Sequence, residues 1–265
     1  MTRPFAGLQG EPDWVALREV VPAATAPLKL KDDDRPVTLA TVLPLAWPAL
    51  VRGDGRIFLG LQVATRSGDV SRDLGWALEQ ALAAEPGSSV VPTGLPGPGP
   101  RLQDLLADEP LEVTVHEGFE FWIEGEVDDA DGEIADSLER ANANVVPTVK
   151  LESAPAAYWC QMRGRAHLRW ALPYDEEPAL DALARLSADG GLGIGPDTKY
   201  VGSFRAHGLL VPVWDLPVDR EAAEIEEPVA ALRSRLEEAL DAPRQLTSDE
   251  RRARAGLLSR QLTLR

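Results

Sequence analysis

The sequence predicts an α+β fold: two halves of the same element order that form one body, followed by a C-terminal helical arm. Alternating apolar runs typical of strands stand between segments with apolar residues at helical spacing. A His, a nearby Gly, an apolar run and a Trp occur at 116–122 (HEGFEFW) and again at 207–214 (HGLLVPVW). Each half reads β-β-β-α-β-β-α, which is typical of an internal duplication. A coincidence within an α+β chain is the alternative interpretation.

The first half, residues 1–145, contains one long helix with clear limits. Asp69 caps its start, and Pro86 with Gly87 stops it. The GDG sequence at 53–55 is a strong turn signal. The other elements expected in this half are a helix at 13–21 capped by Asp13, strands at 28–31, 37–43 and 56–63, a surface connection at 92–100, helical turns at 101–107, a hairpin of 111–115 with 119–123, and a helix at 132–142 carrying Ile134 on its apolar side.

The second half, residues 146–242, repeats this order, and the arm, residues 243–265, follows it. A helix ending in GGLGIG at 190–195 divides the strands into two groups. The elements expected here are strands at 147–151, 157–161 and 167–173 with a turn at 163–165, a helix at 175–188, two strands within 199–216, and a helix at 227–240 with Pro228 in its first turn. In the arm, TSDE at 247–250 is a capping box that predicts a helix.

Composition excludes several classes of protein. A net charge of −16 opposes binding along a DNA duplex, because the phosphates would be repelled. One cysteine provides neither a disulfide framework nor a Cys-rich zinc site. The apolar stretch 38–51 is shorter than the roughly 20 residues that a bilayer requires, and Pro44 and Pro48 interrupt it. No basic-then-apolar leader is visible, so we expect a cytoplasmic protein without a membrane span.

Two of the three histidines, His116 and His207, occupy the echoed positions. They could form an acid–base site with Arg205 and Asp215 in a cleft between the halves, which would be typical of a hydrolase. Alternatively, each histidine lies at a hairpin end and bonds a nearby backbone group. The histidine spacings do not match those of a zinc site.

Other possible reactive groups have simpler interpretations. Cys160 could be a nucleophile beside His167, but a lone cysteine in a strand is more often a buried apolar residue. GGLGIG follows a helix and precedes a strand, which is the reverse of the order that dinucleotide binding needs. The acidic run 32–34 is typical of a charged turn. We therefore expect no cofactor and no metal in this chain.

The arm differs from the rest of the chain in charge, with six arginines and two acidic residues. Its helix carries Arg251, Arg252, Arg254 and Arg260 on several sides. They could bind an anionic partner, or they could pack on the acidic body of the same chain. Both interpretations stay open from the sequence, as does the oligomeric state.

Six segments together resemble an uncharacterised actinobacterial family of unknown function, and the resemblance covers nearly the whole chain. They are 13–25, 37–50, 67–74, 101–106, 202–217 and 246–264, which include DWVALREVVPAAT and GSFRAHGLLVPVWDLP. Fuller members are similar but begin with a Cys-rich SEC-C segment, a zinc-binding motif also found in the SecA translocase motor. This chain has no such cluster. The absence of a recognisable nucleophile, metal or phosphate site, together with the basic arm, favours a non-enzymatic binding or adaptor protein with a protein partner. The resemblance implies a link to protein export or the ribosome through the zinc segment, which is missing from this chain.

Overall fold

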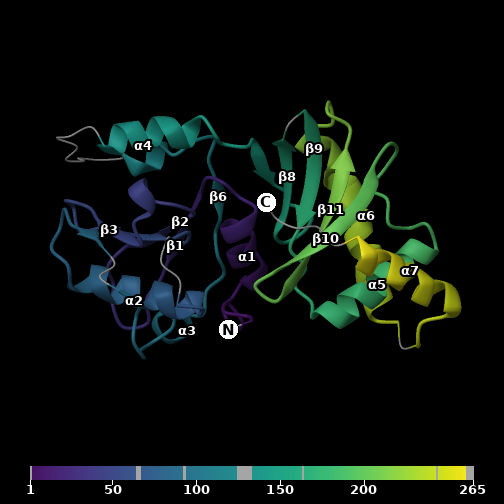
Figure 1. Ribbon diagram of the computed structural model, residues 1–265, viewed down its shortest axis with the longest axis horizontal. Helices are drawn as coiled ribbons and strands as arrows, with labels where there is room; N and C mark the ends of the chain where they lie inside the picture. The colour runs from purple at the N-terminus through teal and green to yellow at the C-terminus, as the bar shows by residue number, and fades with distance from the viewer. Residues whose placement is uncertain are drawn as a thin grey trace. The chain divides into compact units, whose positions relative to one another are not determined.

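The computed structural model describes residues 2–63, 67–91, 94–123, 133–162, 164–242 and 244–260. Its internal contacts divide the chain into two compact units, Met1–Val145 and Val146–Arg265. Each unit has its own sheet (Figure 1). Strands and helices occur in both units, which confirms the predicted α+β class.

The first unit contains a six-stranded mixed sheet with the order β5-β3-β4-β2-β1-β6. Figure 1 shows α2 and α3 on one side of this sheet and α4 on the other. The elements are α1 (Glu11–Glu19), β1 (Ala24–Leu28), β2 (Val37–Ala40), η1 (Pro44–Ala46), β3 (Ala49–Val51), β4 (Ile57–Gly60), α2 (Val70–Ala83), β5 (Ser89–Val90), α3 (Leu102–Leu105), β6 (Thr114–Val115), η2 (Glu120–Trp122) and α4 (Glu133–Asn142).

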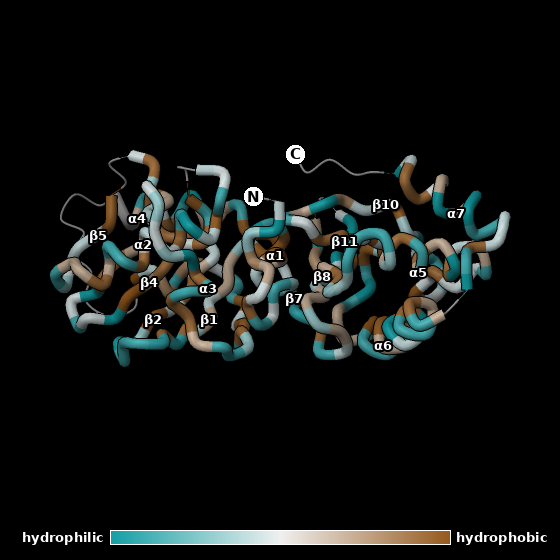
Figure 2. Tube along the Cα trace, turned by 90° about the horizontal axis from the view of Figure 1, so that it is seen from below, coloured by the Kyte–Doolittle hydropathy of each residue, from teal (hydrophilic) through white to brown (hydrophobic). Residues whose placement is uncertain are grey.

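Strands β2 and β4 form the buried centre of this sheet and are mostly brown in the hydropathy colouring of Figure 2. They pair in parallel, because the intervening strand β3 folds back on β4 at the turn that contains Gly55, where φ is 86°. The return places β4 close to the preceding connection. A Cβ at Gly60 would lie 2.6 Å from the carbonyl oxygen of Trp47, so glycine is required there.

Several limits in this unit differ from those expected. The N-cap of α1 is Gly10 in a left-handed conformation (φ 67°) rather than Asp13, which lies inside the helix. Strand β1 starts at Ala24 and ends at Leu28, where 28–31 was predicted. Helix α2 agrees with its prediction, and the side chain of Asp69 accepts a hydrogen bond from the Arg72 backbone N–H. The side chain of Ile134 lies outside the described part of α4.

The predicted hairpin of 111–115 with 119–123 is wrong. Only Thr114 and Val115 form a strand, and Glu120–Trp122 is a short 3₁₀ helix. In this conformation Phe119, Phe121 and Trp122 are all buried, whereas a strand would place alternate residues on opposite faces. The Trp122 indole N–H also donates to the carbonyl oxygen of Val42 at 2.9 Å. Burial of three aromatic rings therefore decides against the strand.

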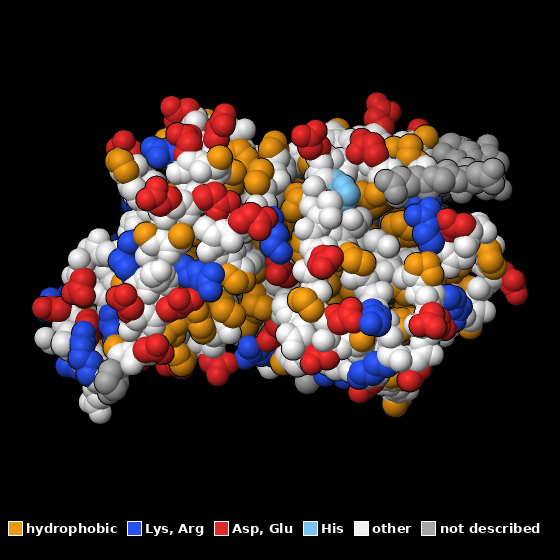
Figure 3. Space-filling view, turned by 180° about the vertical axis from the view of Figure 1, so that it is seen from behind, with side chains coloured by type: hydrophobic (Ala, Val, Ile, Leu, Met, Phe, Trp, Pro, Cys, Tyr) orange, Lys and Arg blue, Asp and Glu red, His pale blue; other side chains and the backbone are white. Residues whose placement is uncertain are grey.

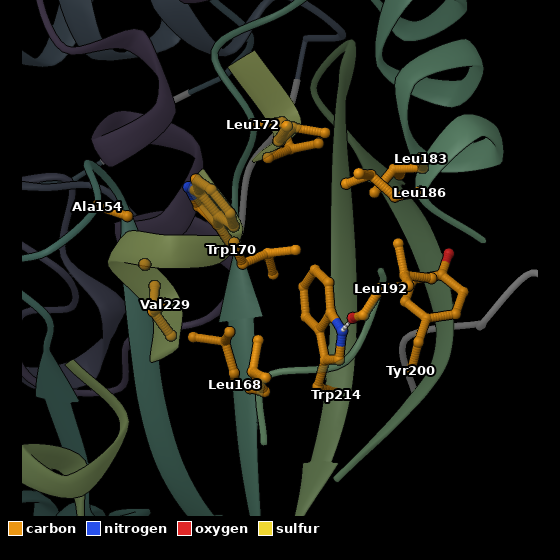
Figure 4. Packing of buried hydrophobic residues seen from close by; sticks show 14 of the residues in the cluster. Ala154, Leu168, Trp170, Leu172, Leu183, Leu186, Leu192, Tyr200, Trp214 and Val229 are labelled. Atoms are coloured by element: carbon orange, nitrogen blue, oxygen red, sulfur yellow. Dashed lines mark hydrogen bonds between the residues drawn. The ribbon is translucent and has the colours of Figure 1, made fainter. Parts of the chain in front are cut away.

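The second unit contains a five-stranded antiparallel sheet with the order β10-β11-β9-β8-β7. Helices α5, α6 and α7 contribute to one core with it, in which Trp170 and Trp214 are fully buried (Figure 4). The elements are β7 (Thr148–Lys150), β8 (Ala157–Met162), β9 (Arg165–Trp170), α5 (Glu176–Ala188), β10 (Lys199–Ala206), β11 (Leu209–Leu216), α6 (Ala222–Leu240) and α7 (Ser248–Ser259).

Helix α6 begins five residues before the predicted start at 227, so that Pro228 lies inside it rather than in its first turn. The side chains of Glu221 and Glu224 form a capping box at this earlier start. Helix α7 begins at the predicted capping box, where Thr247 and Glu250 bond reciprocally. It lies against α5 and so belongs to the second unit.

The order β-β-β-α-β-β-α describes the second unit but not the first. The first unit has an additional strand, β3, and a parallel pair, whereas every pairing in the second is antiparallel. His116 follows the edge strand β6, and His207 lies in the turn between β10 and β11. The similar sequences at 116–122 and 207–214 therefore do not occupy equivalent places. The two units are not the superposable halves of one topology that the repeated order predicts.

Candidate functional site

His116 is fastened to strand β1. Its Nε2 lies 2.8 Å from Thr25 Oγ1, and its backbone N–H donates to the Ala23 carbonyl at 2.9 Å. Its ring lies 5.0 Å from that of Phe121. His116 therefore holds the end of β6 to β1, but its ring contacts a side-chain hydroxyl rather than a backbone group, and it does not lie at the end of the expected hairpin.

The other three residues of the predicted acid–base site do not meet within the second unit. Arg205 pairs with Glu176 at the start of α5, with Nε 2.7 Å from Oε1, and this contact lowers the pKa of Glu176. His207 lies next to it in the β10–β11 turn, in a left-handed conformation with φ 48°. Asp215 lies at the opposite end of β11, about 20 Å away for six residues of strand.

The partner of Asp215 is His167, on the neighbouring strand β9. His167 Nδ1 lies 2.9 Å from Asp215 Oδ1, and Arg165 Nη1 lies 3.1 Å from Oδ2. Burial lowers the pKa of His167, while the Asp215 carboxylate acts in the opposite direction. The result is a partly buried histidine, oriented by a carboxylate, as found at acid–base sites.

Cys160 lies directly opposite His167 in the register of β8 and β9. Directly opposed residues of antiparallel strands project from the same face. The cysteine is 1% exposed, and its burial raises the pKa of the thiol, so that the unreactive protonated form is favoured. The sequence feature that could have indicated the His167–Asp215 contact is the alternation of Arg165, His167 and Arg169, which places these three polar residues on one face of β9.

The arginines of the arm bind within their own unit. Arg254 Nε lies 2.7 Å from Asp181 Oδ1, and its Nη2 contacts Glu177, also on α5. Two others make local contacts, Arg251 with the Leu246 carbonyl and Arg252 with Asp249 at 3.0 Å. The backbone carbonyl of Arg260 accepts from the Ser203 N–H on β10 at 3.3 Å. The helix is therefore bound to the acidic face of α5, as one of the two interpretations expected.

A second charged contact closes the loop before α7. Arg244 binds both carboxylate oxygens of Glu250, whose Oε2 also accepts the Thr247 N–H at 2.7 Å. The guanidinium and this backbone N–H lower the pKa of Glu250 to about 2. The carboxylate is therefore charged throughout the physiological range.

The second unit also contains an apolar groove, whose exposed apolar side chains are not covered by the other described parts of that unit. We call it the Trp159 groove, and its volume is about 600 Å³. Val149 and Val218 are 42% and 52% exposed beside the half-buried indole of Trp159. The complete lining is Val149, Trp159, Gln161, Val218, Asp219, Arg220, Glu221, Ala222 and Ala223.

Hydrogen bonds hold the two sides of the Trp159 groove together. The indole N–H of Trp159 donates to the Arg220 carbonyl at 2.9 Å. The Gln161 side-chain amide donates to the Val218 carbonyl at 3.1 Å. These bonds hold the segment before α6 against β8, and the apolar side chains of Val149 and Val218 are left exposed beside it.

The family model of DUF5926, a family of unknown function, matches residues 4–265. The chain belongs to this family. No curated protein and no solved structure matches this DUF5926 chain. The family therefore places the whole chain in one group of related proteins, and function has to be argued from the structure.

Metal clusters and membrane-spanning helices do not occur in the part of this DUF5926 chain that the structure describes. Within the described ranges, no group of three or more His, Cys, Asp or Glu side chains could hold a metal ion. None of the helices in that part of the chain is both long and apolar enough to cross a bilayer. On the face drawn in Figure 3, acidic and basic side chains are interspersed rather than gathered by sign.

Proposed function

We propose that this protein is a cytoplasmic, non-enzymatic binding or adaptor protein, and that its second unit holds a short segment of a protein partner in the Trp159 groove. The observation that carries the proposal is the exposure of Val149 and Val218 on either side of Trp159. Apolar side chains grouped around an aromatic ring are typical of the central contacts of protein interfaces.

The charges around the Trp159 groove define the chemistry of the partner. Asp219 and Glu221 outnumber Arg220 at its rim, and the whole chain carries a net charge of −16. A complementary segment would present an apolar side chain next to lysine or arginine. The resemblance to chains with a SEC-C segment directs the search for this partner to protein export and the ribosome.

A peptide display library tests this proposal with the full-length protein as bait. We expect enrichment of peptides with an apolar residue beside a basic one. Val218→Asp should weaken their binding at least about tenfold, because it places a charge where an apolar side chain would be buried. Leu95→Asp is the matched control, since Leu95 is 66% exposed and does not line the groove. Equal binding by Val218→Asp and the original chain would refute the proposal.

One observation favours a second candidate, an acid–base enzyme of the hydrolase type. It is the hydrogen bond from His167 to Asp215, with Arg165 on the same carboxylate. A panel of chromogenic esters and amides tests this candidate. Turnover that His167→Asn abolishes and His207→Asn leaves intact would support it; absence of turnover across the panel would count against it.

A further inference from the structure

The first unit contains a gap along the outer edge of strand β1. Residues Ala24 and Thr25 pair with β6 on this edge. Further along, Lys29 and Lys31 bond to the segment 105–107, with Ala107 N–H donating to the Lys29 carbonyl at 2.9 Å. Between these two contacts lies a cavity of about 320 Å³, which is within the range of small-molecule sites.

The residue in the middle of this gap is Pro27. Proline has no N–H and cannot donate to a neighbouring strand. The pairings of β1 with β6 and with 105–107 lie on either side of it along the same edge. A peptide strand running alongside β1 would collide with these segments. An occupant must therefore be compact.

The walls of the gap are mixed: eight of the twelve lining residues are apolar, four are polar or charged, and Trp14 is the aromatic residue among them. The lining residues are Leu8, Gln9, Trp14, Pro27, Leu28, Lys29, Leu106, Ala107, Glu109, Pro110, Leu111 and Glu112. Trp14 is 2% exposed and stacks on Phe5, with ring centroids 5.7 Å apart. Such walls favour a ligand with an apolar, preferably aromatic, body.

The indole N–H of Trp14 has no acceptor among the residues that the structure describes. Four other tryptophans each donate to a backbone carbonyl at 2.8–2.9 Å: Trp122, Trp159, Trp170 and Trp214. The half-buried Trp47 and Trp76 have no acceptor in the described residues either, so that Trp14 is the most buried of the three without one. The Trp14 N–H is accessible rather than sealed in the core, since it is not one of the buried side-chain atoms that lack a partner. A carbonyl oxygen on a ligand within the cavity that Trp14 lines would accept a hydrogen bond from it.

The rim of the cavity adds an electrostatic preference. Lys29 Nζ lies 2.7 Å from Glu109 Oε1, so these two charges are paired. Glu112 is the remaining charged residue of the lining. The excess of one carboxylate favours a ligand that carries a positive charge.

We propose that this cavity binds a small apolar compound that carries both an ammonium group and a carbonyl oxygen. The apolar body lies against Trp14 and Leu28, the carbonyl accepts from the Trp14 N–H, and the ammonium group faces Glu112. This chemistry occurs in free amides and esters of apolar amino acids and in the first residue of a peptide. The site is separate from the Trp159 groove and does not depend on it.

Nuclear magnetic resonance of the full-length chain tests the site, because each indole N–H gives its own signal. The signal that Trp14→Phe removes belongs to Trp14. On titration with L-phenylalaninamide we expect this signal to move to a saturating value while the other indole signals stay in place. A Trp14 signal that does not move at millimolar ligand would overturn the proposal.

Further titrations with other ligands and variants define the ligand chemistry. N-acetyl-L-phenylalaninamide, which keeps the ring and carbonyl but lacks the ammonium group, should bind more weakly. Glu112→Gln should weaken L-phenylalaninamide about three- to fivefold, as expected for an exposed charge pair, and Trp76→Phe should leave it unchanged. Equal binding of the acetylated and free amines would contradict the assigned chemistry. The peptide Phe-Gly-Gly separates the two sources: it binds if the ligand is a peptide end and fails if the ligand is a free small molecule.

Discussion

The two sheets of this protein start from a similar order of elements and reach different topologies. In the second unit each strand pairs with a strand next to it in the chain, apart from the return of β11 to β9. In the first unit the connection after β2 places β3 outside β4, and β2 and β4 become parallel neighbours. The connections between strands, rather than the strands themselves, therefore determine the strand order and the strand directions in each sheet.

The binding features differ in the same way. The second unit has a continuous antiparallel ladder, and its groove lies beside the edge strand β7, above Trp159. The first unit has an interrupted edge, and its cavity lies within the interruption at Pro27. A groove with exposed valines fits a protein segment, whereas a small cavity lined by Trp14, whose indole N–H has no acceptor among the described residues, fits a compact ligand.

The largest effect is expected from truncating the central tryptophan of the second core. Trp214→Ala should lower the free energy of unfolding by about 3–5 kcal/mol, because Trp214 is fully buried on the internal strand β11. Trp122→Ala should cost less, about 2–3 kcal/mol, because a one-turn 3₁₀ helix can relax into the vacated space. Urea denaturation of both variants measures the difference; a larger cost for Trp122→Ala would reverse the comparison.

The parallel pair of the first unit depends on Gly60. Gly60→Ala should destabilise the protein by about 1–3 kcal/mol, because its Cβ would lie 2.6 Å from the Trp47 carbonyl oxygen. Gly53→Ala is the matched control, since nothing lies within 4 Å of a Cβ there. Thermal denaturation compares the two. Equal melting temperatures would show that the connection after β2 can move away from a Cβ at position 60, and would contradict the requirement for glycine there.

The attachment of α7 to α5 should depend on one arginine. Arg254→Ala removes contacts with Glu177 and Asp181 and should cost about 0.5–1 kcal/mol, because the pairs are partly exposed. Arg252→Ala should cost less, since its side chain is 81% exposed and its partner is on the same helix. Hydrogen exchange of the α7 amides measures the attachment. Faster exchange in Arg252→Ala than in Arg254→Ala would assign the attachment to other residues.

The smallest effect concerns pH and His167. Burial lowers its pKa in the folded state, so the unfolded chain binds the proton more readily. Stability should therefore decrease as the pH falls below about 6.5, the ordinary value for histidine, and should not change with this group above it. Asp215→Asn should lower the pKa of His167 further, because it removes the carboxylate that favours the charged ring. Titration of the ring signals measures the pKa of His167 in the two proteins, and denaturation at several pH values measures the stability. A raised pKa of His167 in Asp215→Asn would contradict the effect assigned to the carboxylate.

Local signals were sufficient to predict much of the fold. Asp69 and Pro86 mark the ends of α2, because caps and stops act on the nearest turn of helix. The capping box of Thr247 and Glu250 marks the start of α7 in the same way. The order of elements in the second unit also follows from the sequence, since each strand and helix there has its own apolar period.

The candidate sites could not be predicted in the same manner. The sequence grouped Asp215 with His207, but the register of β9 and β11 pairs it with His167. The segment 119–122 has the residues of a strand, and burial of its rings makes it a 3₁₀ helix. No local sequence signal marks Pro27 as the centre of a gap. The gap is formed by β6 and by the segment 105–107, which pair with β1 on either side of Pro27 and lie far from it in the sequence.

Residues close together in the sequence are sufficient to specify the α+β class and the capped helices, whereas they leave open whether the basic arm packs on its own chain or binds a partner. Those properties depend on residues within a few positions of one another, where backbone hydrogen bonds and apolar periods act. The packing of the folded chain selects which strands are neighbours, which tryptophans donate to a backbone carbonyl and which valines stay exposed. Those properties depend on contacts between residues far apart in the chain, and the packing of whole elements selects them.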